Sequence, residues 1–192
     1  MNIDFFSARS LSLFKPFSAI HIIALMLIVV LSIFLLYILK NKSDRDKKAF
    51  RVILGCFALF LQIFYDIWLI VNGNFNLKES LPLNICSVSL ILVFILFLTK
   101  NKIIFSIQYF WGIIGSSYAL IFPNIMHNFP HFRFVEYFLA HGLILFSVLY
   151  FLYTEKYSIS LKSVVITYIF SVLYLGIVFL LNLALGANYL FL

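Results

Sequence analysis

Charged side chains are scarce in this sequence. Asp, Glu, Lys and Arg make up 11% of the 192 residues, whereas a soluble domain carries about 25%. Apolar residues account for 64% of the chain, and its mean hydropathy is +1.09. Too few polar side chains exist to cover a surface that faces water, so a soluble enzyme and a disordered chain are excluded. The composition predicts a membrane protein.

Cysteine is equally scarce, because the chain has only Cys56 and Cys86. In the spans predicted below, these two residues lie near opposite membrane faces, whereas the Cα atoms of a disulfide lie within about 7 Å of each other. A disulfide scaffold is therefore excluded. The sequence also lacks a glycine-rich phosphate loop, an HExxH zinc motif and a GxSxG nucleophile motif. We expect no cofactor.

Acidic residues are outnumbered by basic ones, with 7 Asp and Glu against 14 Lys and Arg, which gives a net charge of +7. A nucleic-acid surface would combine a basic stripe with interleaved aromatic side chains. Here the aromatic residues, including 24 Phe, lie inside the apolar runs and the cations lie between them. Nucleic acid is therefore excluded as a partner.

The sequence does contain six hydrophobic runs of about 18–23 residues, which as helices would be roughly 27–35 Å long, the thickness of a hydrocarbon core. They cover residues 17–39, 52–71, 81–98, 103–122, 132–153 and 164–185. Backbone polar groups in lipid must be satisfied within the segment. We therefore predict an all-α fold: one transmembrane domain over residues 1–192, a polytopic bundle of six helices. The first run is too long for the apolar core of a signal peptide.

The distribution of Lys and Arg predicts how this bundle is oriented. Ten cations lie in the first, third and fifth connections: Lys40, Lys42, Arg45, Lys47, Lys48, Arg51, Lys100, Lys102, Lys156 and Lys162. The other connections and the termini hold four: Arg9, Lys15, Lys78 and Arg133. Because positively charged loops stay in the cytoplasm, we expect both termini outside and a multi-pass protein of the cell membrane. The run from Lys40 to Arg51 is expected to be a cytoplasmic hairpin that also contacts anionic lipid headgroups.

In this orientation, the strongly polar residues of all six spans fall in the outer leaflet. They include His21, Gln62, Tyr65, Asp66, Asn84, Cys86, His131, Arg133, Glu136, Tyr137, His141 and Asn182. An ionisable group at mid-bilayer costs about 2.5–3.5 kcal/mol and normally faces a bundle interior or a wet cavity. We therefore expect a polar pocket that opens outward and takes a membrane lipid or a small polar solute.

The segment from His127 to Gly142 holds most of the chemically active side chains. Pro130 suits the first turn of a helix, so Arg133, Tyr137 and His141, four residues apart, form one polar stripe that points into the bundle. Glu136 is three residues from Arg133 and can pair with it.

The histidines have three interpretations. His127 and His131 have the spacing of a zinc helix, but Pro130 falls between them, and His131 and His141 are about 15 Å apart along the helix, too far for one ion. We therefore assign no metal. A structural role with hydrogen-bonded rings and a role in proton transfer both remain.

Three further side chains also have alternative roles. Cys86 is either a small apolar filler or a nucleophile that takes His131 or His141 as its base. Asp66 is expected to be protonated or to pair with Arg133 or a histidine. Arg133 is expected to be held by Glu136, by Asp66 or by an anionic ligand group.

Several motifs together resemble a known family. They are Leu81-Pro-Leu-Asn-Ile-Cys-Ser87, Phe110-Trp-Gly112, Phe129-Pro-His-Phe-Arg-Phe134, His141-Gly142 and Asn188-Tyr189. From about His21 to Leu192 the chain resembles the YwaF-type integral membrane proteins of Firmicutes. These are distantly similar to an animal multispan family credited with phospholipid acyl transfer, in which a Pro-Cys-His run is implicated.

The resemblance implies a membrane acyltransferase, and the alternative is a binding or transport protein for a lipid or small polar solute. It implies catalysis by His131, His141 and Cys86, and substrate binding by Asn84, Arg133, Glu136, Tyr137, Asp66 and His21. Asn84 stands where the bacterial family commonly has His, and an alignment on Pro82 would put the Pro-Cys-His run on Leu83 and Asn84. Family members usually continue into a seventh span, so the resemblance implies a chain truncated before it.

Overall fold

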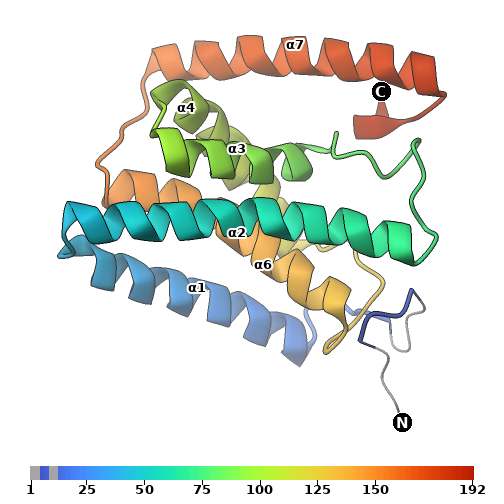
Figure 1. The fold of residues 1–192 in the computed structure, drawn as a ribbon, viewed down its shortest axis with the longest axis horizontal. Helices are drawn as coiled ribbons and strands as arrows, with labels where there is room; N and C mark the ends of the chain where they lie inside the picture. The colour runs from blue at the N-terminus through green and yellow to red at the C-terminus, as the bar shows by residue number, and fades with distance from the viewer. Residues whose placement is uncertain (1–4, 9–12) are drawn as a thin grey trace.

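Six apolar helical segments run back and forth through the protein (Figure 1), of which the computed structural model describes residues 5–8 and 13–192. The segments are α1 (Ala19–Lys40), α2 (Asp44–Val71), α3 (Ile85–Thr99), a composite of α4 (Lys102–Trp111), η1 (Gly112–Ser116) and α5 (Ser117–Ile121), then α6 (Phe132–Tyr153) and α7 (Leu161–Leu185). A 3-10 turn, η2 (Tyr189–Phe191), follows. The predicted all-α fold class is confirmed.

Five of the six segments are long and apolar enough to cross a membrane, and α3 is apolar but has only 15 residues. The outermost helices expose large apolar side chains that a soluble protein would bury, such as Val30 and Ile33 on α1 and Leu173 and Leu180 on α7. Such surfaces are stable in contact with lipid tails. The multi-pass membrane character is therefore supported by both length and surface.

Two helices begin at other residues than the hydrophobic runs predicted, because polar residues determine where each helix starts. The second helix begins at Asp44 instead of residue 52, because the Ser43 side chain accepts a hydrogen bond from the Asp46 backbone N–H and starts the helix in a polar segment. The third begins four residues later than its run, because the residues from Leu81 to Asn84 form a turn before it. The fifth span, residues 132–153, coincides with α6.

Helix α6 is the central helix and packs against α1, α2, α3, α4, η1 and α5. In Figure 1 it runs obliquely behind α2, while α7 lies along one edge and rests on α4. The main core forms where α6 meets α2, α3 and α4, and its fully buried members include Ala58, Val93, Leu96, Phe105, Ile144, Val148 and Phe151. Side chains on α6 are therefore within reach of several neighbouring helices.

Two glycines let helices approach closely. A Cβ atom at Gly55 on α2 would lie 3.3 Å from the backbone oxygen of Phe94 on α3. A Cβ atom at Gly142 on α6 would lie 3.2 Å from the Ile28 side chain on α1. Small residues at such contacts are typical of helix packing in membranes.

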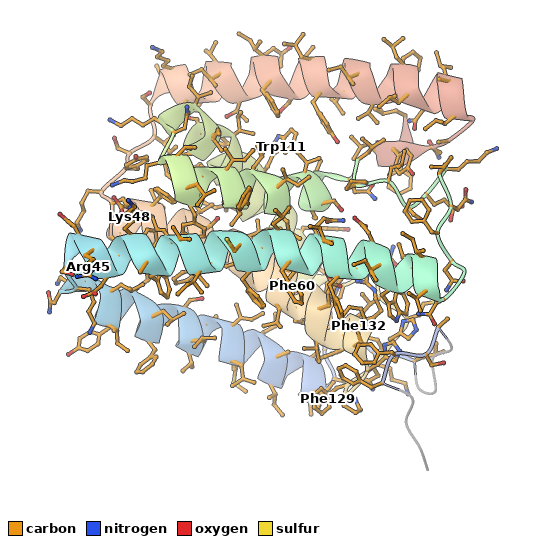
Figure 2. All side chains as sticks on the ribbon, in the orientation of Figure 1. Arg45, Lys48, Phe60, Trp111, Phe129 and Phe132 are labelled. Carbon is orange, nitrogen blue, oxygen red and sulfur yellow. The ribbon has the colours of Figure 1, made fainter. Side chains whose placement is uncertain are left out.

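The bundle has two chemically different ends. We call the end where α1, α3 and α6 begin the histidine end, and the end where α2, α4 and α7 begin the lysine end. Figure 2 shows Arg45 and Lys48 at the lysine end of α2, and Phe129 and Phe132 near the other end. The expectation that the histidine end faces outside stays a prediction; Arg9, one of the cations counted for it, lies outside the described residues.

An ion cluster joins the elements of the lysine end. Glu155 accepts from Arg51 at 2.5 Å, forms an ion pair with Lys100 and accepts from the Tyr150 hydroxyl at 3.0 Å. Burial alone would raise the pKa of Glu155, but the Lys100 and Arg51 cations hold it below its usual value. The cluster ties α2 and α6 to the turn between α3 and α4.

Candidate functional site

The polar side chains of α6 form one cluster at the histidine end. Arg133 forms an ion pair with Glu136 one turn later, as the sequence predicted. Its guanidinium carbon also lies 3.9 Å from the centre of the Tyr65 ring, which α2 presents to it. Glu136 is buried. The arrangement fixes a planar cation between an aromatic face and a carboxylate.

Asp66 has a different partner from the one predicted. Its Oδ1 accepts a hydrogen bond from Gln62 Nε2 at 3.0 Å, one turn back on α2. No ion pair within 4.0 Å joins it to Arg133 or to a histidine among the described residues. Of the two alternatives predicted for Asp66, pairing with Arg133 or a histidine is not found among the described residues, and protonation stays a prediction. Asp66 still adds negative charge near Glu136.

His141 is buried on α6, with one ring nitrogen engaged and one free. Its Nδ1 donates to the Tyr137 backbone carbonyl at 2.8 Å, so in the neutral ring Nδ1 carries the proton and Nε2 holds a lone pair. Nε2 has no hydrogen-bond partner in the described part of the chain. The imidazole packs on the Tyr137 ring, with the centroids 4.1 Å apart. The lone pair on Nε2 is the position at which this ring could accept a proton.

Cys86 reaches the same region from α3. It is a free thiol in the first turn of that helix, half buried, and packs against the main core. It lies close enough to Tyr137 to interact with it electrostatically. The Tyr137 hydroxyl is fixed because it donates to the Ala119 carbonyl at 3.0 Å. Cys86 and His141 thus both neighbour Tyr137.

His131 stands at the start of α6 with both ring nitrogens occupied. Its Nδ1 accepts from the Arg133 backbone N–H at 3.0 Å, which caps the helix, and its Nε2 donates to the Ser7 carbonyl at 2.8 Å. The His127 ring stacks on it at 4.0 Å and donates to the Ala8 carbonyl at 3.3 Å. In this arrangement His131 serves the fold and is not a free base.

Residues 5–8 form a strap across these histidines. Four consecutive backbone carbonyls of the strap accept hydrogen bonds, from Phe132 N–H, Trp68 Nε1, His131 Nε2 and His127 Nε2 in chain order. Burial, with the nearby His131 and Arg133, lowers the pKa of His127, while its bond to Ala8 opposes this change. The strap is therefore held by both histidine rings and by Trp68.

His21 is a structural residue. It is fully buried, its Nδ1 accepts from the Phe17 backbone N–H at 2.9 Å, and its Nε2 donates to the Leu120 carbonyl at 2.8 Å. The ring therefore joins α1 to the end of α5. Both nitrogens are used, so the structure does not bring it into the cluster as a ligand group.

Asn84 is not part of the α6 cluster and instead lines a separate cavity. This cavity of about 410 Å³ is also lined by Lys78, Glu79 and residues 186–189. The Tyr189 hydroxyl donates to the Leu77 carbonyl at 2.8 Å and accepts from the Leu81 N–H at 2.9 Å. Asn182 in turn bonds the Tyr189 backbone N–H and carbonyl, each at 2.9 Å. The C-terminal turn thereby positions the segment that leads to Cys86.

An apolar cavity of about 120 Å³ lies next to the α6 cluster, between α1, α2 and α6. Its lining includes Ile28, Phe57, Phe138, Gly142 and Phe146. Gly142 follows His141 directly in the sequence. The cavity is suited to hydrocarbon.

Two parts of the site were missed by sequence reasoning. The sequence placed Tyr65 among the polar residues of the outer leaflet but not beneath Arg133, because this contact joins two helices and no pattern within one apolar run indicates it. The strap of residues 5–8 also gave no signal, because its contacts use backbone carbonyls. Trp68, whose indole N–H needs a partner when buried, was the available hint.

The family comparison agrees with this architecture. A family model described as the TMEM164 family matches residues 16–192, which is nearly the whole chain. No curated protein and no solved structure matches it. The matched region contains all six apolar segments and every residue of the α6 cluster. The chain therefore belongs to the TMEM164 family, a family of multispan membrane proteins.

Proposed function

We propose that the cluster at the histidine end is a lipid-processing site that transfers an acyl chain between membrane lipids, in a protein of the cell membrane. The observation that carries the proposal is the free Nε2 of His141 beside Tyr137, with Cys86 within electrostatic reach of the same tyrosine. Covalent acyl transfer needs a nucleophile and a base, and the proposal gives these roles to Cys86 and His141. The YwaF-type resemblance supports the same chemistry and is itself part of the proposal.

In the proposed reaction, the Cys86 thiol gives its proton to His141 Nε2 as its sulfur attacks the ester carbonyl of a phospholipid. The carbon–oxygen bond of the ester breaks, and the leaving alkoxide takes the proton back from the imidazolium. An acceptor hydroxyl, again deprotonated by His141, then attacks the thioester and restores the thiol. His141 is preferred over His131 as the base because both nitrogens of His131 are engaged.

Arg133 and the apolar cavity supply the proposed substrate contacts. The guanidinium has five N–H donors, of which the Glu136 ion pair uses Nη1. The remaining donors are available to a lipid phosphate, which a planar fork binds well. The cavity beside Gly142 takes part of the acyl chain.

The test is an acyl-transfer assay with purified protein in vesicles of phosphatidylcholine, in which one acyl chain is isotopically labelled, and a lysophospholipid that supplies the acceptor hydroxyl. Product lipids are measured by mass spectrometry. We expect His141→Gln and Cys86→Ser to lower turnover by about a hundredfold or more, since a general base alone contributes 10²–10⁴. Cys56→Ser, at an exposed thiol on α2, is the matched control and should be silent.

Two results would decide against the enzyme. Full turnover in His141→Gln would remove the proposed base. A wild-type protein that binds phospholipid without turnover, with affinity lost in Arg133→Ala, would support the alternative of a binding or transport protein. Comparison of the lipids of a deletion strain with those of its parent identifies the substrate in either case.

A further inference from the structure

A second cavity lies at the opposite end of the bundle from the α6 cluster. It has a volume of about 380 Å³ and lies between the start of α4 and the start of α7. Its lining contains three lysines, Lys102, Lys156 and Lys162, and four serines, Ser106, Ser158, Ser160 and Ser163. A cavity with this lining is suited to an anion.

The positive charge of this cavity is not balanced within the described residues. Glu155 also lines it, but its carboxylate is already shared by Arg51 and Lys100. Lys156 and Lys162 have no ionic or hydrogen-bond partner in the described part of the chain. Lys102 has only an aromatic neighbour, its Nζ lying 5.7 Å from the Tyr157 ring centre.

Hydroxyl donors are available on the same wall. The Ser160 and Ser163 hydroxyl oxygens each accept the backbone N–H of the other residue, in the capping box that starts α7. The two oxygens are 3.4 Å apart, so one hydroxyl hydrogen joins them and the other is free to donate. The Ser158 hydroxyl has no partner among the residues the structure describes.

The floor of the cavity is held in place by Tyr157. Its hydroxyl donates to the Lys100 carbonyl at 2.6 Å, and its backbone N–H donates to the Phe151 carbonyl at 2.9 Å. Its ring packs on Phe105 and Phe151, each with centroids 5.2 Å apart. Because these contacts hold the loop in place, binding requires little reordering of it.

We propose that this cavity binds the phosphate of an anionic phospholipid headgroup. Lysines bind phosphate as point charges, and basic pockets between helices on the cytoplasmic side of a membrane are suited to anionic lipid heads. A lipid is favoured over free phosphate because Ile103 and Ile166 also line the cavity and the exposed side chains beside it on α7, Leu161 and Val164, are apolar. The site is independent of the proposed acyl transfer, since it shares no residue with it.

The experiment uses the purified full chain in detergent and follows its thermal unfolding by tryptophan fluorescence. Dioctanoyl phosphatidylglycerol is the anionic probe, dioctanoyl phosphatidylcholine has the same chains without net charge, and inorganic phosphate tests the free anion. The site variant is Lys102→Gln/Lys156→Gln/Lys162→Gln. The matched control is Lys40→Gln/Lys42→Gln/Lys48→Gln, which removes three exposed cations from the same end of the bundle.

We expect phosphatidylglycerol, at concentrations where phosphatidylcholine has no effect, to raise the unfolding midpoint of the wild type and of the control variant, because a ligand that binds only the folded state stabilises it. The apparent affinity should fall about tenfold or more in the site variant, since hydrogen bonds to charged groups are among the strongest. If inorganic phosphate gives the same shift, the cavity is a phosphate site, but its ligand is the free anion and not a lipid headgroup.

Equal weakening in both triple variants would mean diffuse attraction to a charged surface and would overturn the proposal. An equal shift with phosphatidylcholine, or no shift in the wild type, would do the same. If the triple variant fails to fold, Lys162→Gln alone, at an exposed side chain, must show the weaker binding.

Discussion

The four histidines differ in how many of their ring nitrogens are engaged. His21 and His131 use both nitrogens in hydrogen bonds, whereas His127 and His141 each use one. A ring that accepts at one nitrogen and donates at the other has one defined tautomer. The same residue type therefore serves as a structural link at two positions, whereas at the other two one ring nitrogen has no partner among the residues that the structure describes.

His127 predicts a dependence of stability on acid. Its folded pKa lies below the ordinary value of 6.5, so the unfolded chain binds the proton more readily. The stabilising contribution is complete above about pH 6.5 and is lost as the pH falls toward the folded pKa. We expect the unfolding midpoint in detergent to drop as the pH falls below about 6.5.

The control for this prediction is His127→Gln, which keeps a side-chain donor for the strap but does not titrate. Its unfolding midpoint should be flatter over the same interval. Glu155 does not interfere, because its pKa is lowered from 4.5 and its contribution is lost only at lower pH. An unchanged pH dependence in the variant would assign the effect to another group.

Arg133→Lys tests whether the planar guanidinium matters beyond its charge. Lysine can keep the ion pair with Glu136 but loses the flat contact with Tyr65 and the two-pronged geometry. We expect acyl-transfer activity to fall about tenfold while expression is retained, and Tyr65→Leu to cause part of the same loss. Unchanged activity, expression and thermal stability in Arg133→Lys would remove Arg133 from the site.

Among the helices, the α2–α3 contact is the one most sensitive to added volume. Gly55→Ala would place a methyl group 3.3 Å from the Phe94 backbone oxygen and from Phe97 Cβ, neither of which can turn away. We expect a loss of about 1–3 kcal/mol in the free energy of unfolding, typical of overpacking. Urea or thermal unfolding in detergent measures it.

Gly176→Ala is the matched control for Gly55→Ala. Gly176 also lies within a helix, but a Cβ atom there would have no neighbour within 4 Å. Alanine should be neutral there or gain up to about 1 kcal/mol from helix propensity. Similar losses in both variants would mean that helix flexibility, and not the contact with α3, explains the effect.

For the helices, hydropathy predicted that six apolar segments exist, but it did not predict the geometry within each segment. The fourth run contains a π-helical turn from Gly112 to Ser116. Hydropathy gives the length of an apolar run but not which carbonyl accepts each backbone N–H. The third run is interrupted at its start by the turn through Pro82 and Asn84. Both departures depend on hydrogen bonds that a composition window does not contain.

For the whole molecule, the orientation in the membrane is the open prediction. In a background of Cys56→Ser and Cys86→Ser, Asn74→Cys should react with a membrane-impermeant maleimide on intact cells, whereas Ser43→Cys should react only after permeabilisation. Positively charged connections stay in the cytoplasm, and Ser43 lies in the most basic of them. Labelling of Ser43→Cys on intact cells would show that the bundle has the opposite orientation in the membrane.

The sequence predicted those contacts of the site that join residues close together on one helix. The Arg133–Glu136 pair follows from residues three apart on one helix, and it is present. The bond from His131 to Ser7 joins residues 124 positions apart, and the Tyr65 ring meets Arg133 from a separate helix. Contacts of this kind depend on how helices pack, which no pattern within one segment encodes.

The anchoring of the α3 entrance by Tyr189 also bears on biosynthesis. Leu77 and Leu81 leave the ribosome early, but the hydroxyl that holds them belongs to a residue 112 and 108 positions later, respectively. Because chains are made from the N-terminus at about 5–20 residues per second, the first three helices wait in the membrane for several seconds or more before Cys86 can reach its final position. The Cys86 thiol would therefore remain unassembled until translation of the chain is almost finished.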